Sequence, residues 1–237
     1  MCGRITLTRP NLESIASELD VSAEAMRGYP IYHPHYNIAP TQEHPVLTTH
    51  ELEGNRSRVV TPMKWGIADR TRRMLSINAR AEGIESRPKW REAFWKSRCA
   101  VITDGFFGRT GEKAKRRPLW FHRADYGLIL LAGLWAWEQD DRGFFQSFAI
   151  VTTAANELMA PIHDRMPAIL TSADLPLWLD DRSPDVARLR QTLTPAPVDL
   201  LVAQPVSPLV NNVANDRPGI LEVQSGSERS PRRSPFE

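Results

Sequence analysis

Hydrophobic side chains in the first twenty residues recur at helical spacing. Leu12, Ile15, Ala16 and Leu19 lie three and four positions apart, with Pro10 just before them. This spacing predicts a short amphipathic helix with the proline in its first turn. Further helices are predicted from the same kind of pattern at residues 86–96, 172–179 and 184–193.

The middle of the chain changes to short apolar or alternating runs separated by turn residues, which is typical of β-strands. Strands are predicted at residues 99–103, 118–122, 128–135, 144–152 and 198–203. Residues 125–127 and 140–143 resemble hairpin connections. Residues 28–45 contain Gly28 and several prolines, which predicts a loop. Consecutive hairpins with helices outside them favour the α+β class over a parallel βαβ arrangement.

Composition favours one globular domain. The 237 residues are 41% hydrophobic and 24% charged, which is ordinary for a soluble protein. Apolar runs stay short of the ~18 residues that span a bilayer, so no membrane segment is expected. No secretory signal pattern opens the chain, which favours a cytoplasmic protein. Residues 225–237 are rich in Ser, Arg and Pro and are predicted to be a disordered tail after a domain over residues 1–224.

Charge and cysteine content narrow the function classes. The net charge is only +2, yet basic residues concentrate at 70–73 and 113–117. Either cluster suits a phosphate backbone, and a solvated loop explains the second equally well. The two cysteines form no disulfide framework, and Cys99 reads as a buried strand residue. No metal-ligand spacing occurs, so neither a metal nor another cofactor is expected.

The second residue offers unusual chemistry. Methionine aminopeptidase removes Met1 when the next side chain is small, and Cys2 is small. The mature chain would then begin with a thiol and a free α-amine on adjacent carbons. Their ordinary pKa values lie near ~8.5 and ~7.7–8.0, so both groups react partly at neutral pH. Together they can close a five-membered thiazolidine ring on an aldehyde, which an internal cysteine cannot do.

Several segments contain more polar residues, glycines and prolines than packing requires. They are Cys2-Gly3-Arg4, Tyr36–Pro40, Ile77–Glu82, Thr103–Phe107, Ile162–Pro167 and Val206–Asn211. In this order and spacing the chain resembles the SOS-response-associated peptidase (SRAP) family, also called abasic site processing proteins. The resemblance runs from Cys2 to about Leu221. It implies a single α+β domain of twisted antiparallel sheets that form a barrel-like core flanked by helices.

The resemblance also implies a function. A family member of this kind would be a monomer that binds single-stranded DNA and attaches covalently to abasic sites in the DNA damage response. The amine of Cys2 would condense with the ring-opened sugar aldehyde, and the thiol would close a thiazolidine. The DNA–protein crosslink would shield the lesion, and the protein would be associated with the nucleoid when bound. The family name also implies peptidase or lyase activity.

Roles for individual residues follow from the resemblance. Cys2, Asn78 and His163 would be catalytic, with Asn78 as an orienting amide and His163 as a proton shuttle. Arg4 and Arg80 would hold phosphates, because a guanidinium fork matches phosphate oxygens. Further DNA-binding positions are Gly3, Asn37, Pro40, Arg87, Thr152 and Arg165. For Arg165, a phosphate contact and an ion pair with Asp164 both fit the sequence.

The chain departs from the family pattern in two places. The glutamate that follows the Asp-Gly-aromatic-aromatic motif in the family is Gly108 here, and Glu112 stands four residues away. We expect crosslinking to persist while ring opening, reversal or autoproteolysis is impaired, because acid–base assistance is worth ~10²–10⁴-fold. Arginines at 70–73 replace tryptophans found in some relatives, which predicts DNA binding that weakens steeply with salt.

Other functions fit parts of the same sequence. Glutamine amidotransferases with an N-terminal nucleophile also begin Met-Cys-Gly, but glutamine-binding motifs are missing here. A non-catalytic relative that binds single-stranded DNA would explain the missing glutamate, although it would not explain Cys2, Asn78 and His163 together. A protease acting on other proteins is a third alternative. Glutamine hydrolysis and abasic-site crosslinking assays separate these functions.

Overall fold

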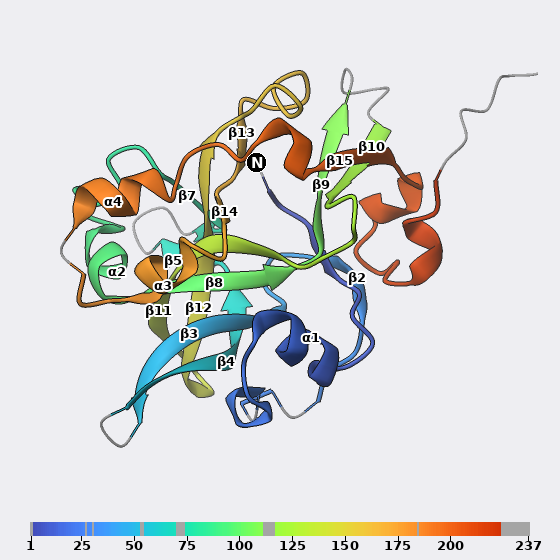
Figure 1. Ribbon diagram of the computed structural model, residues 1–237. Helices are drawn as coiled ribbons and strands as arrows, with labels where there is room; N and C mark the ends of the chain where they lie inside the picture. Colours follow the sequence, from blue (N-terminus) through green and yellow to red (C-terminus); the bar gives the residue numbers. More distant parts are fainter. Residues whose placement is uncertain are drawn as a thin grey trace, which may run out of the picture.

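Two β-sheets form the centre of the molecule (Figure 1). The computed structural model describes residues 2–26, 28–29, 31–52, 55–69, 74–110, 117–183 and 185–223. The strands are β1 Ile5–Leu7, β2 His35–Ile38, β3 Glu43–Leu52, β4 Asn55–Trp65, β5 Ile67–Asp69, β6 Met74–Ser76, β7 Asn78–Arg80, β8 Arg98–Thr103, β9 Gly105–Thr110, β10 Arg117–His122, β11 Ile129–Asp140, β12 Gly143–Ala154, β13 Arg165–Pro167, β14 Ile169–Leu170 and β15 Val202–Pro205. The helices are α1 Leu12–Leu19, α2 Arg91–Lys96, α3 Leu175–Leu179 and α4 Val186–Gln191, with short 3-10 turns such as η4 Pro208–Asn211.

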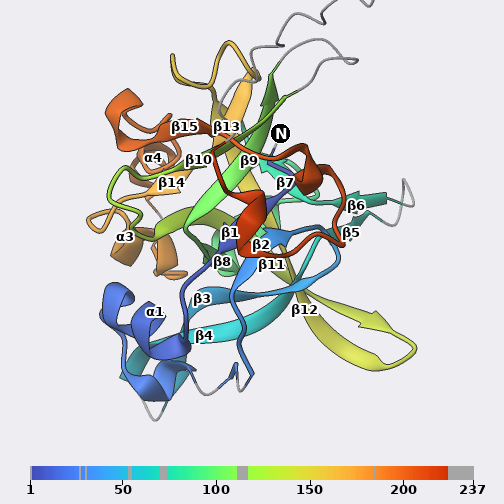
Figure 2. The ribbon, with the colours of Figure 1, turned by 90° about the vertical axis from the view of Figure 1, so that its right-hand side faces the viewer.

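The larger sheet closes on itself. Its strands pair in the order β12, β4, β3, β8 and β11, and β11 pairs again with β12. This ring is the barrel-like core that the family resemblance implied, and the α+β class is confirmed. The smaller sheet has the order β15-β10-β9-β1-β2 and lies beside the barrel (Figures 1 and 2). Helices α2, α3 and α4 gather on one flank, apart from α1 (Figure 1).

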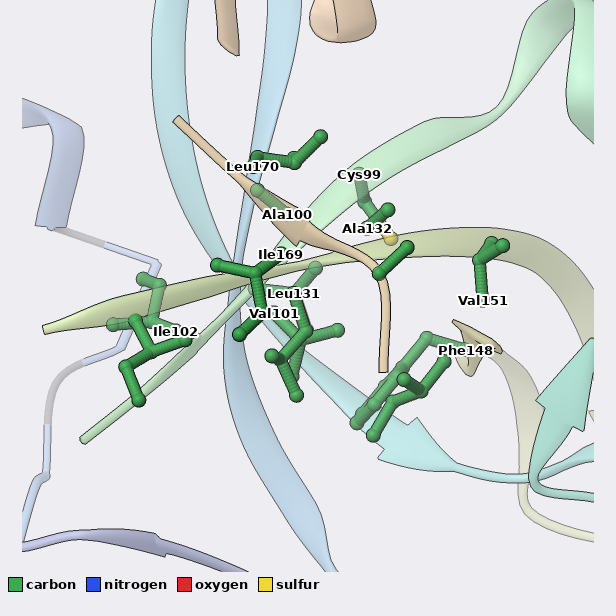
Figure 3. Close-up of a cluster of buried hydrophobic side chains, with 14 of the residues drawn as sticks. Cys99, Ala100, Val101, Ile102, Leu131, Ala132, Phe148, Val151, Ile169 and Leu170 are labelled. Atoms are coloured by element: carbon green, nitrogen blue, oxygen red, sulfur yellow. The ribbon is translucent and has the colours of Figure 1, made fainter. Parts of the chain in front are cut away.

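Buried hydrophobic side chains pack around the strands of the barrel. Figure 3 shows such a cluster from β8, β11, β12 and β14, among them Val101, Leu131 and Phe148. Cys99 belongs to this cluster and is fully buried, as the sequence predicted. His44 is also buried, and its Nε2 lies 2.6 Å from the carbonyl of Ile102. Burial lowers the pKa of His44 to about 3, so this ring is neutral at pH 7.

Several predicted elements are confirmed and others are wrong. Strands β8, β10, β11 and β12 cover the predicted runs, and residues 140–143 connect β11 to β12 as a hairpin. Residues 125–127 do not form one, because β10 and β11 belong to different sheets. The predicted loop at 28–45 contains β2 and the start of β3. Helices α2, α3 and α4 are shorter than predicted, and residues 198–200 form a 3-10 turn before β15.

The connections around β12 determine where the candidate site lies. Strand β7 runs parallel to β12 and pairs Asn78 with Ile150 and Arg80 with Thr152. Strand β13 pairs antiparallel with the same end of β12, with Arg165 opposite Ala154. The chain begins beside β7, β9 and β13 in both views (Figures 1 and 2). No helix within the described part of the chain is long and apolar enough to cross a membrane.

Candidate active site

Cys2 lies at the junction of the two sheets, just before β1. Its exposed fraction is only 3%, and its Sγ is 4.0 Å from the carbonyl oxygen of Arg4. The Nδ2 of Asn78 donates a hydrogen bond of 2.8 Å to the carbonyl of Cys2. The same stretch is tied to β9 because the N–H of Phe107 donates to the carbonyl of Arg4 at 3.0 Å. Asn78 therefore fixes the backbone that carries the thiol.

The environment of Cys2 keeps its thiol protonated. Burial raises the pKa of the Cys2 thiol to about 12, while the positive charge of the chain's N terminus and the contact with the Arg4 carbonyl act in the opposite direction. A thiol with this pKa is neutral at pH 7 and needs a base to become a nucleophile. A free α-amine on Cys2 itself would bring a positive charge closer and favour the thiolate.

Asn78 has an unused acceptor. Its Oδ1 is buried and accepts no hydrogen bond, whereas its Nδ2 is committed to Cys2. An unsatisfied buried carbonyl oxygen costs about 1–3 kcal/mol. Such an oxygen is available to a donor that enters the site, such as an amine or a sugar hydroxyl.

His163 has two competing partners on one ring nitrogen. The backbone N–H of Arg165 points to Nδ1 at 3.0 Å, and the Oδ1 of Asp164 lies 2.7 Å from the same atom. A neutral ring accepts from the amide in one tautomer and donates to the carboxylate in the other. Each tautomer therefore has a partner at Nδ1, and Nε2 presents a proton in the first and a lone pair in the second.

The charge state of His163 suits proton transfer. Burial lowers its pKa, and the positive charges of the N terminus and Arg165 act in the same direction, against the opposing effect of Asp164. The ring is therefore neutral at pH 7 and able to accept a proton. Its side chain is 36% exposed, so solvent and substrate reach it.

A cavity of about 380 Å³ lies beside His163 and beside Gly3 and Arg4, the two residues that follow Cys2. It is lined by Gly3, Arg4, Phe107, Gly108, Arg109, Pro118, Met159, Ile162, His163 and Val210. The guanidinium groups of Arg4 and Arg109 line the cavity, and among the described residues no carboxylate does. The other lining residues, apart from His163 and two glycines, are apolar.

Arg4 is held in place by the C-terminal part of the chain. Its Nη1 donates to the Oδ1 of Asn37 at 2.5 Å and to the carbonyl of Val210 at 2.9 Å. The Nδ2 of Asn37 donates in turn to the carbonyls of Val210, Asn212 and Asn215, at 3.2, 3.0 and 2.8 Å. Asn37 is buried, with an exposed fraction of 1%. In this structure its side chain orients Arg4 and faces no open surface.

A second polar group gathers around Thr152. Arg165 donates to both carboxylate oxygens of Glu82, with Nη2 to Oε2 at 2.8 Å, and also to the carbonyl of Thr152. Glu82, not Asp164, is therefore the ion-pair partner of Arg165. The contact with Arg165 lowers the pKa of Glu82, and the nearby charge of Arg87 acts in the same direction. Arg80 is exposed beside them on β7.

The two glycines of the site differ in the space around them. A Cβ built on Gly3 would meet only the Cδ1 of Ile77, at an ordinary 3.8 Å. A Cβ on Gly108 would lie 2.9 Å from Cε2 of Phe121 and 3.2 Å from Cγ2 of Ile162. Gly3 is thus not required by packing within the chain, whereas Gly108 is.

The structure brings most of the predicted residues into two adjoining groups. Gly3, Arg4 and His163 line the cavity, and Cys2 precedes them and is bonded to Asn78. Arg80, Thr152 and Arg165 meet on β7, β12 and β13. Three predicted positions lie outside these groups. Asn37 is buried and bonded to Arg4, Pro40 is half-buried after β2, and Arg87 is exposed before α2.

Arg109 was not predicted. It follows Gly108 on β9, where the family motif had no expected arginine, and only the folded chain brings it close to Arg4. The basic segments at 70–73 and 113–116 lie outside the described residues, as does the tail at 225–237. Within the described part of the chain, no three His, Cys, Asp or Glu side chains gather as metal ligands would.

Comparisons with known proteins identify the family of the chain. The family model described as "SOS response associated peptidase (SRAP)" matches residues 1–213. The abasic site processing protein YoqW of Bacillus subtilis is 33% identical over 230 residues, which cover 94% of this chain and 99% of that protein. The abasic site processing protein HMCES of Rattus norvegicus is 27% identical over 268 residues. The match covers 93% of this chain and 75% of that protein.

Solved structures share the fold. A crystal structure of a Bacteroides thetaiotaomicron protein superposes with a TM-score of 0.78 at 24% identity, covering 94% of this chain and all of that one. A Bordetella bronchiseptica protein gives a TM-score of 0.70 at 21% identity, over 87% of this chain and all of its own. On the family match and the YoqW identity, the chain belongs to the SRAP family, whose curated relatives include proteins named for abasic site processing.

Proposed function

We propose that this protein binds single-stranded DNA and forms a covalent thiazolidine crosslink between Cys2, freed of Met1, and an abasic site. The observation that carries the proposal is the arrangement of Cys2: its carbonyl is held by Asn78 beside a cationic cavity that His163 also lines. The crosslink would protect the lesion from strand cleavage during the response to DNA damage.

The reaction requires two bond-forming steps on one sugar carbon. The α-amine of Cys2 adds to the C1 aldehyde of the opened sugar and expels water, which leaves a protonated imine. The thiol then loses its proton to a base and its sulfur attacks the imine carbon, which closes the five-membered ring. One water is lost in total, and the neutral imidazole of His163 is suited to take the thiol proton.

Cationic groups around the cavity fit a phosphate backbone. Arg4 lines the cavity, while Arg80 is exposed on the neighbouring strand. Gly3 leaves room for close approach, since a Cβ there would meet a single side-chain atom of the protein. Arg165 is already paired with Glu82, so a direct contact with DNA would require it to exchange that partner. The alternative role is structural, in which Arg165 holds β12 and β13 together.

The absence of a carboxylate at position 108 shapes the expected kinetics. No described residue that lines the cavity supplies an acid for sugar ring opening other than protonated His163. We therefore expect slow formation and slow reversal of the crosslink, and weak lyase or autopeptidase turnover. A binding-only relative remains the second candidate function, because Gly108 and the packed Phe121 leave no space for the family glutamate without rearrangement.

A denaturing-gel assay tests the proposal. Protein whose Met1 removal has been checked by intact mass is incubated with single-stranded DNA carrying one abasic site, beside a Cys2→Ala variant. A heat-stable shifted band that requires Cys2 supports crosslinking. DNA binding without such a band would identify a binding-only protein, and neither signal would exclude both functions.

A further inference from the structure

The cavity next to Gly108 contains more positive charge than its surroundings neutralise. Burial lowers the pKa of Arg4, and the nearby charge of Arg109 acts in the same direction. No ion pair to Arg4 or Arg109 occurs among the described residues. Two neighbouring guanidinium groups without a carboxylate repel each other, and a bound anion reduces that repulsion.

Arg4 also has a free hydrogen-bonding edge. Its Nη1 is used by Asn37 and Val210, but its Nε is buried without any partner, and its Nη2 bonds to no described residue. Nε and Nη2 form the edge of a guanidinium that matches the two oxygens of a carboxylate. A buried donor without a partner costs free energy that an anionic acceptor would restore.

The apolar residues that line the cavity favour a monocarboxylate over inorganic phosphate. Apart from the two arginines, His163 and two glycines, the cavity is lined by the apolar residues Met159, Ile162, Phe107, Pro118 and Val210. A tetrahedral inorganic phosphate would leave oxygens against this apolar surface without hydrogen bonds. A monocarboxylate places its two oxygens on the guanidinium edge and its apolar body against the wall, and a volume of about 380 Å³ holds such a molecule easily.

We propose that this cavity binds a small free monocarboxylate with an apolar body, and that the bound acid performs the proton transfers for which the lining residues offer only His163. The inference rests on the proposed function for its chemical step. In that step, the bound carboxylate takes the proton of the C1 hydroxyl, whose oxygen becomes the aldehyde while the bond between C1 and the ring oxygen breaks. The acid formed in this way gives its proton to the released ring oxygen. The carboxylate is regenerated and no net atoms or electrons are exchanged.

The test uses the full chain in buffer free of carboxylates, at constant ionic strength set with chloride, because DNA binding depends on salt. Crosslinking rates are measured with protein in excess while propionate is added, with propionamide as a neutral isostere and inorganic phosphate as a second anion. We expect a saturable acceleration of about tenfold or more with propionate alone. Arg109→Gln is expected to raise the half-saturating propionate concentration about tenfold, whereas Arg142→Gln, an exposed arginine at the β11–β12 turn, leaves it unchanged.

Several outcomes would overturn the inference. Inhibition by propionate would mean that a DNA phosphate occupies the cavity, and a linear, non-saturable acceleration would mean buffer catalysis in solution. A slower rate without propionate in Glu112→Gln would mean that the chain supplies its own carboxylate. Binding without DNA is measured by NMR. Wild-type protein is expected to broaden the propionate signals, and the Arg109→Gln variant is expected to broaden them less. If no crosslink forms under any condition, the proposed function fails while this readout still decides whether the carboxylate site exists.

Discussion

Restoring a glutamate at position 108 requires space that the wild-type chain fills with Phe121. A Cβ at this position would lie 2.9 Å from Cε2 of Phe121 and 3.5 Å from Cε of Met159. Phe121 is fully buried and stacks on Phe106 at a ring-centroid distance of 5.3 Å, so it cannot simply swing away. Overpacking of this kind costs about 1–3 kcal/mol. We therefore expect Gly108→Ala alone to lower the free energy of unfolding by that amount.

Phe121→Leu provides the missing space. Alone it should cost about 1–2 kcal/mol, less than the ~3–5 kcal/mol typical of Phe→Ala. In the double variant the two losses should not add, because the leucine no longer meets the new Cβ. The expected coupling energy is about 1 kcal/mol or more, measured by urea denaturation with unchanged m-values. Losses that add to within ~0.3 kcal/mol would refute the argument that Phe121 restricts position 108.

Substitutions at Gly108 and Phe121 together should also change the rate of crosslinking. Gly108→Glu in the Phe121→Leu background should crosslink abasic DNA about 10²-fold faster than Phe121→Leu alone, because a positioned acid becomes available. Gly108→Gln in that background is the matched control, since it fills the same volume without an ionisable group. Equal rates for the Glu and Gln variants would contradict the view that the site lacks an acid.

Other predictions follow from buried polar groups. Because the pKa of His44 is about 3 when folded and near ~6.5 when unfolded, the unfolded chain alone takes up a proton below pH 6.5, and stability falls as the pH drops towards 3. From pH 7 to pH 5 this should cost about 2 kcal/mol in denaturation experiments and be absent in His44→Gln. Asn37→Ala should lower the free energy of unfolding by about 2–4 kcal/mol and slow crosslinking, because Arg4 and three backbone carbonyls lose their partner. Crosslinking at the wild-type rate would argue against a positioning role for Asn37. Gly3→Ala should melt like wild type yet bind abasic DNA more weakly, as judged by fluorescence anisotropy, and unchanged binding would show that DNA does not approach this glycine.

Local sequence patterns predicted part of the fold. The apolar runs of β8, β11 and β12 were recognisable because these strands are buried along most of their length. The start of strand β3 was missed because Pro45 belongs to the proline-containing segment at residues 28–45, which was predicted to be a loop. In the structure Pro45 lies directly opposite Pro62 of β4, so two residues without N–H groups face each other in the ladder. Only the pairing partner makes this segment recognisable as a strand.

The candidate site shows the same limit. Cys2, Asn78 and His163 were predicted from motifs. In the structure a hydrogen bond connects Asn78 to Cys2, and His163 lines a cavity together with Gly3 and Arg4, which follow Cys2. The support of Arg4 by Val210 joins positions 206 residues apart, which no local pattern reports. Arg109 was missed for the same reason, because its relevance depends on the proximity to Arg4 that folding creates.

The measurement that tests the central claim most directly is the intact mass of the covalent complex. We expect a species whose mass equals the chain without Met1 plus the abasic oligonucleotide, less one water, formed without any reducing agent. Cys2→Ser should give a species of the corresponding type only after borohydride trapping, because a hydroxyl does not close a stable ring in place of the thiol. A stable complex that retains Met1, or one that Cys2→Ala still forms without a reducing agent, would contradict crosslinking through Cys2.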